Sequence, residues 1–145
     1  PLAVQKIIQD IGFTNLSTKR SFFEYERISK NSIIELQAPL DDIGTSGAII
    51  SIRFCVSNPI EVLTDFFETV ENLSKSINFS IHDKQCNKSF NDLSIDDKNF
   101  IRQEFLKRKK AVEELYGKVN KPIRCNDYWD FVEKHQLGKA KWVGN

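Results

Sequence analysis

The chain has few cysteines and lacks long apolar runs. The first feature argues against a cysteine-based site, and the second against a membrane span. Cys55, Cys86 and Cys125 are odd in number, lie far apart and form no CxxC pair, so neither a zinc site nor a thioredoxin-type site is predicted. No apolar run has the length of a membrane span, and no signal-peptide pattern opens the chain. Because the sequence also contains no methionine, we expect the native start to lie upstream of Pro1. Free thiols favour a reducing compartment, and we expect a cytoplasmic protein.

Recognisable catalytic motifs are also missing. His82 and His135 each stand alone, without an HExxH pair or a nucleophile-elbow pattern. The glycine-containing loop "APLDDIGTSGA" lacks the Gly-Lys-Ser/Thr ending that would cradle phosphate and does not lead into a helix. We therefore expect no metal or cofactor, and the sequence does not assign an enzymatic activity.

The composition is that of an ordinary globular domain. The 145 residues are 40% hydrophobic and 28% charged, which predicts a single domain over residues 1–145. The net charge is only +1, but it is unevenly distributed. Residues 1–83 carry 7 Lys/Arg and 11 Asp/Glu, whereas residues 84–145 carry 14 Lys/Arg and 9 Asp/Glu. This asymmetry indicates either a partner surface or two surface regions that attract one another.

Apolar periodicity predicts an α+β fold, with a mostly antiparallel sheet of about four strands covered on one face by helices. "LAVQKIIQDIGF" predicts a short amphipathic helix that stops at Gly12. "SFFEYERISKNSIIELQA" predicts a hairpin, with strands 22–28 and 32–38 joined at Lys30 and Asn31. "GAIISIRFCV" alternates as a strand over 48–56, with one wholly apolar face.

The remaining elements are mostly helices. Asn58 before Pro59, with Glu61 following, predicts the capped start of a helix that runs to Ile77. "NFSIHD" predicts a fourth strand with Phe79 and Ile81 turned inward, and "CNKSFND" reads as a loop. The last two predicted helices span 94–116, with a capping box at its start and a glycine at its end, and 126–138, followed by a loose tail over about 139–145.

The hairpin predicts an acidic strip. A two-residue turn places Glu26 opposite Glu35, with Glu24 near them on the face of the sheet away from the apolar side. Arg53 on the next strand could offset them. We expect this face to be exposed. These four residues, with Asp41 and Asp42 in the neighbouring loop, are predicted to contact a protein partner, and a paired surface cluster is the alternative.

The most basic segment is "FLKRKK". Successive residues on a helix lie about 100° apart, so Lys107, Arg108, Lys109 and Lys110 fan around the helix instead of forming one patch. A solvated helix face, polyanion binding and docking on an acidic protein all remain open.

These signals favour a non-enzymatic protein-binding module. The specific version is a small protein of the bacterial immunity or antitoxin kind that blocks a basic toxin domain. The alternatives are a nucleic-acid-associated protein that uses its basic second half, and a small hydrolase or transferase whose residues converge only in the fold.

Overall fold

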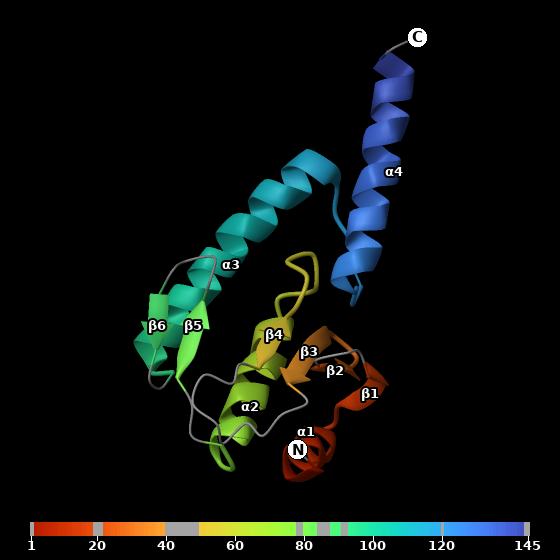
Figure 1. The fold of residues 1–145 in the computed structure, drawn as a ribbon. Coiled ribbons are helices and arrows are strands. Elements are labelled where there is room, and N and C mark those ends of the chain that lie inside the picture. The colour runs from red at the N-terminus through yellow and green to blue at the C-terminus, as the bar shows by residue number, and fades with distance from the viewer. Residues whose placement is uncertain are drawn as a thin grey trace.

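The computed structural model describes residues 2–18, 22–39, 50–77, 80–83, 88–90, 93–119 and 121–143. It confirms the α+β fold, with a four-stranded antiparallel sheet and helices that cover one of its faces (Figure 1). The helices are α1 (Leu2–Asp10), α2 (Val62–Ser74), α3 (Ile95–Tyr116) and α4 (Cys125–Val143). The strands are β1 (Thr14–Thr18), β2 (Phe22–Ile28), β3 (Ile33–Pro39), β4 (Ser51–Arg53), β5 (Ile81–Asp83) and β6 (Lys88–Phe90).

The large sheet has the order β1-β2-β3-β4, and every neighbouring pair is antiparallel. The hairpin is confirmed in its register, because Glu26 lies opposite Glu35 and Tyr25 opposite Leu36. The amide of Ser29 donates to the carbonyl of Ser32 at 2.9 Å and closes the turn over the two residues predicted to form it. Turn residues and side-chain alternation were therefore sufficient to predict the pairing of β2 with β3.

The first strand of this sheet was not predicted. β1 has the sequence TNLST, which shows neither a run of apolar residues nor a strict alternation. The register shifts between Asn15 and Ser17, so Leu16 is bulged, and its side chain is 54% exposed. Backbone pairing with β2 forms this edge strand, and side-chain burial contributes little to it.

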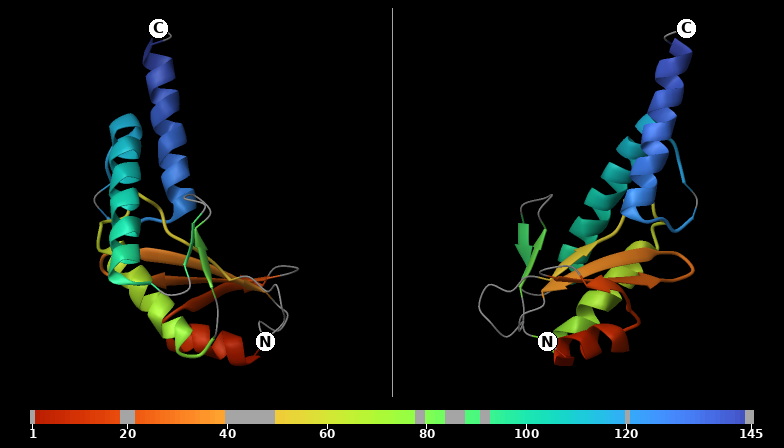
Figure 2. Two further views of the ribbon diagram at one scale, coloured as in Figure 1. Left: turned by 90° about the vertical axis from the view of Figure 1, so that its left-hand side faces the viewer. Right: turned by 45° about the vertical axis from the view of Figure 1, so that its right-hand side comes forward.

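One face of the sheet packs on α1 and α2, which lie on the same side of it (Figures 1 and 2). Ile8 of α1, Tyr25 and Leu36 of the sheet, and Leu63 of α2 are almost completely buried there. Ile50, Ile52, Phe54 and Val56 pack against the same core, which confirms the apolar face predicted for this segment. Regular pairing of the segment is shorter than predicted, because β4 covers only Ser51–Arg53.

Helix α2 begins later than predicted. Its N-cap is Glu61 in a helical conformation without a side-chain cap, and the predicted capping residue Asn58 lies in the preceding turn. The side chain of Asn58 is buried and makes hydrogen bonds elsewhere, described below. A capping pattern therefore identified a polar residue of structural importance but gave it the wrong role.

Strand β5 is confirmed, but it does not join the large sheet. It pairs with β6 in a separate two-stranded sheet, through Ile81–Phe90, His82–Ser89 and Asp83–Lys88. The segment predicted as a loop therefore contributes a strand, while Phe79 lies outside the described residues. The polar segment that contains β6 shows no alternation of apolar and polar residues, so its pairing with β5 was not predicted.

The two long helices α3 and α4 extend away from the sheet (Figures 1 and 2). The predicted capping box of α3 is confirmed, because the hydroxyl of Ser94 accepts from the amide of Asp97 at 3.1 Å and the Asp97 carboxylate accepts from the Ser94 amide at 3.2 Å. Gly117 ends the helix at φ 100°, a conformation that favours glycine. The last helix does not stop at Gly138 as predicted but continues to Val143.

The molecule has two parts. The body is the four-stranded sheet with α1 and α2, and the arm is α3 with α4. Within the described residues, none of the helices is both long and apolar enough for a membrane span.

Candidate functional site

The predicted acidic strip is largely neutralised within the chain. Glu26 is buried, and Arg124 holds it with two hydrogen bonds, Nε to Oε2 at 2.7 Å and Nη2 to Oε1 at 2.8 Å. The expectation that this carboxylate lies on an exposed sheet face is therefore wrong, because the start of α4 covers it. Hydrogen bonding to the guanidinium lowers the pKa of Glu26 despite burial, and the same bonds raise the pKa of Arg124.

The other members of the strip also have contacts in the chain. Arg53 forms an ion pair with Glu35, with Nε 3.0 Å from Oε2, as the sequence suggested. Glu24 accepts a hydrogen bond of 2.6 Å from the hydroxyl of Ser17. Asp41 and Asp42 lie outside the described residues. The structure therefore brings Glu26, Glu35 and Arg53 into one row of the sheet, but a role of these six residues in partner contact stays a prediction.

Two thiols lie close to this row. Cys55 is buried and belongs to the same apolar cluster as the partly buried Cys125 at the start of α4. Burial raises the pKa of Cys125 to about 12, and a hydrogen bond to Glu35 contributes to the shift. Burial likewise raises the pKa of Cys55. Both groups are therefore protonated and unreactive near neutral pH.

The body and the arm meet at Asn58. Its amide oxygen accepts from the backbone amides of Ile33 at 3.2 Å and Ile123 at 3.1 Å. Its amide nitrogen donates to the carbonyls of Cys55 at 2.9 Å and Ile123 at 3.1 Å. One buried side chain thus ties β3 to the segment just before α4, and we call this set of contacts the joint.

Lys109 attaches α3 to the same place. Its ammonium group donates to the carbonyl of Asn58 at 2.7 Å and to that of Val56 at 3.4 Å, and it forms an ion pair with Glu113 at 2.9 Å. Its side chain is only 15% exposed. One of the four predicted polyanion-binding cations is therefore used to hold the arm in place.

The rest of the basic segment is divided around α3, as helix geometry predicts. Lys107 and Lys110 are exposed, whereas Arg108 is half-buried and has interactions of its own. The four cations thus do not present one continuous basic surface. Their role in polyanion binding stays a prediction.

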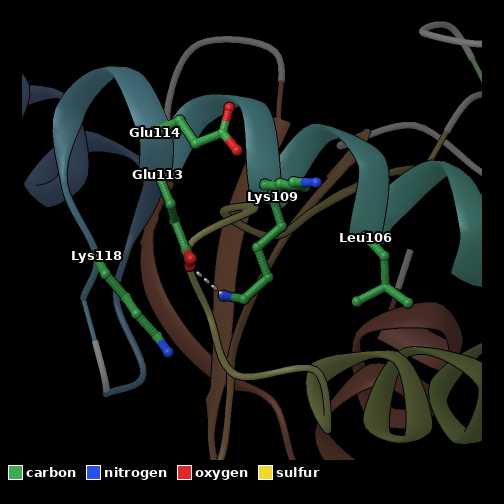
Figure 3. Close-up of a pocket in the computed structure, with 6 residues that line it drawn as sticks. Leu106, Lys109, Glu113, Glu114 and Lys118 are labelled. Carbon is green, nitrogen blue, oxygen red and sulfur yellow. Dashed lines mark ion pairs between the residues drawn. The ribbon is translucent and has the colours of Figure 1, made fainter.

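A hollow of about 470 Å³ lies along this side of α3 (Figure 3). It is lined by Leu106, Lys109, Lys110, Glu113, Glu114 and Lys118. In Figure 3, Glu113 and Lys109 meet beneath the helix, Lys118 points toward the same space, and Glu114 lies on the upper side. This feature was not predicted from the sequence, although Leu106, Lys110 and Glu113 recur at the three- and four-residue spacing of one helix face.

A second surface missed by the sequence analysis is the outward face of α2. Glu61, Thr64, Glu68, Glu71 and Lys75 are all exposed and lie three or four residues apart. Three of these five side chains are acidic, and Glu68 forms a 3.6 Å ion pair with Arg27. The three- and four-residue spacing of these positions could have identified this acidic stripe from the sequence.

Of the two histidine side chains, the structure describes that of His82. His82 is exposed on β5, with Nδ1 2.9 Å from the hydroxyl of Ser89 on β6. The side chain of His135 lies outside the described set. In the described part of the chain, no group of three or more His, Cys, Asp or Glu side chains is arranged to hold a metal ion.

Comparisons of the chain with protein-family models, with curated proteins and with solved structures find no match.

Proposed function

We propose that the chain is a protein-binding module without a catalytic role, and that its partner is a basic protein domain. The observation that carries this proposal is the acidic stripe, formed by the exposed residues Glu61, Thr64, Glu68, Glu71 and Lys75 along the outward face of α2 and at its two ends. Three of the five are acidic and one is basic. These residues lie on a helix whose opposite side is fixed in the core of the body, so they form a preorganised surface. Preorganisation reduces the entropy that a partner must overcome on binding.

The charge distribution supports a basic partner. Residues 1–83, which contain the body, carry 7 Lys/Arg against 11 Asp/Glu, while the arm lies in the basic part of the chain. Complementary charge accelerates the encounter of two proteins and disfavours partners of the wrong sign. The specific version that we propose is a cytoplasmic protein of the immunity or antitoxin kind, which occupies a basic toxin domain through this stripe.

The strip on the sheet is a poorer choice for testing this proposal. Reversing the charge of Glu26 would place a cation against Arg124 and would destabilise the attachment of α4, so a loss of binding would be ambiguous. Glu61 and Glu71 are exposed and have no ion pair with the described residues. Changing them affects the surface and leaves the core intact.

The test is affinity capture by the tagged chain from nuclease-treated lysate of its source, at low and moderate salt, followed by kinetics with the captured protein. We expect one basic protein, and we expect Glu61→Lys with Glu71→Lys to slow its association by about tenfold at low salt. The control, Asp130→Lys with Glu133→Lys, makes the same charge change on exposed positions of α4.

Equal association rates for the two double variants would contradict the stripe as the contact surface. Recovery from untreated lysate that disappears after nuclease treatment, or that falls steeply with salt, would instead support the nucleic-acid alternative through Lys107, Arg108, Lys109 and Lys110. Failure to capture any protein would contradict the binding module and would leave the hydrolase or transferase alternative to an activity screen.

A further inference from the structure

We propose that the hollow on α3 is a second docking surface, which takes an acidic and apolar segment of another protein. This inference goes beyond the proposed function, because it concerns a different part of the molecule and a partner of the opposite charge. It does not depend on the acidic stripe of α2.

The charges that line the hollow are not equivalent. Lys109 and Glu113 neutralise one another at 2.9 Å, and the lysine also donates to the backbone carbonyls of Val56 and Asn58. Lys110 and Lys118 are exposed and make no ion pair within the described part of the chain. In Figure 3, Lys118 points into the space beneath α3. Glu114 is an exposed carboxylate that also lines the hollow, so two lysines stand against one glutamate and the charge available to a ligand is positive by one unit.

An apolar contact lies beside these cations. The side chain of Leu106 is 44% exposed at one end of the hollow, and the helix brings Lys110 next to it one turn later. Protein interfaces commonly combine an apolar centre with a charged rim, and burial of an exposed leucine by a partner is favourable. An aliphatic or aromatic side chain next to Asp or Glu satisfies both features.

The lining also argues against a small apolar ligand. Pockets for small molecules are lined mainly by apolar and aromatic side chains, with few polar groups. Here Leu106 is the one apolar residue among six that line the hollow, and the other five are lysines and glutamates that bring charged groups together with their aliphatic stems. A segment of a protein, which can place carboxylates and an apolar side chain on neighbouring positions, fits this surface better.

The test uses two synthetic probes and backbone amide NMR of the full chain. One probe is a peptide in which leucines are interspersed with Asp and Glu, and the other has every acid replaced by lysine. We expect the acidic peptide to shift the amide signals of α3 near Leu106, Lys110 and Lys118, and the basic peptide to leave them unchanged.

Matched variants locate the contact. Lys110→Glu with Lys118→Glu should weaken binding of the acidic peptide by about tenfold or more, because both cations contact it. The control, Lys107→Glu with Lys121→Glu, changes the same charge at exposed lysines outside the hollow and should have at most about a twofold effect through long-range attraction.

A third variant is independent of charge. Leu106→Ser removes the apolar contact at an exposed position. It should weaken binding of the acidic peptide while the fold is retained. Equal binding of both peptides, shifts confined to other elements, equal losses in the two lysine variants, or no shift at millimolar peptide would each overturn the proposal. Because these probes do not involve α2, their failure would leave the proposed function standing.

Discussion

Helices α2 and α3 are held to the molecule in different ways. Six of the 13 residues of α2 are buried, whereas α3 buries only Phe105 among its 22. The body is therefore stabilised mainly by apolar burial. The arm buries less: Phe105 and Ile101 of α3 pack into the core of the body, and a small apolar cluster forms around the start of α4. The polar contacts of Asn58, Lys109 and Arg124 complete this attachment, which we call the root of the arm. Apolar burial is non-directional, and buried hydrogen bonds require a defined geometry, so the polar contacts fix where the arm sits.

The largest expected effect comes from breaking the joint. Asn58→Ala leaves the buried amides of Ile33 and Ile123 without their acceptor and should lower the free energy of unfolding by about 3 kcal/mol. Urea denaturation followed by circular dichroism measures the change. The control Asn99→Ala alters an exposed residue of α3 and should stay within about 0.5 kcal/mol of the parent. Equal stability of the two variants would show that the joint does not hold the parts together.

The second effect tests the attachment of α4. Arg124→Ala removes both hydrogen bonds to buried Glu26 and should cost about 2 kcal/mol at pH 7, less than for a fully buried pair because the arginine side chain is 40% exposed. Arg53→Ala breaks the neighbouring pair with Glu35 through a more exposed arginine and should cost less than about 1 kcal/mol. A larger loss of unfolding free energy in Arg53→Ala than in Arg124→Ala would contradict this ranking of the two ion pairs.

The pH dependence of the unfolding free energy tests the same ion pair. The pKa of Glu26 is lower in the folded protein than the ordinary value of 4.5, so its ion pair stabilises the fold above that value. This contribution is lost as the pH falls through the folded-state pKa. The stability difference between the parent and Arg124→Ala should therefore narrow on acidification from about pH 6 toward about pH 3, and a constant difference would contradict the ion pair as its cause.

The smallest expected effect is chemical protection at the root of the arm. Because burial raises the pKa of both Cys55 and Cys125, alkylation by iodoacetamide at about pH 8 should be at least about tenfold slower in the folded protein than in urea. Mass spectrometry of the peptides resolves each site. Equal rates with and without urea would mean that the arm opens freely. The raised pKa of Cys125 also predicts that its contribution to stability is lost as the pH rises from the ordinary value of 9.0 to about 12.

Local signals predicted the parts of the fold that local interactions determine. The hairpin register followed from the alternation around Lys30 and Asn31, and both ends of α3 followed from Ser94 with Asp97 and from Gly117. Each of these features depends on residues that are close in sequence, where turn and capping preferences apply.

The remaining features arise from contacts between distant segments. No local pattern pairs Glu26 with Arg124 or connects Asn58 to Ile123, because the partners are 98 and 65 residues apart. The polar strand β1 is formed by backbone pairing, which its side chains do not signal. The acidic stripe and the hollow could be recognised in the sequence as helix faces. Which of their residues are exposed, and which form ion pairs, follows only from the three-dimensional arrangement.

The separation of 98 residues between Glu26 and Arg124 has a consequence for the order of folding. Contacts between neighbouring strands close short loops, whereas this pair closes most of the chain, and entropy delays such closure until other contacts have formed. We therefore expect the hairpin to assemble with its carboxylate still hydrated, and α4 to dock in a late step. Arg124→Ala should then accelerate unfolding and leave the refolding rate nearly unchanged in stopped-flow experiments. The arginine would act as a latch that sets how long the native state persists.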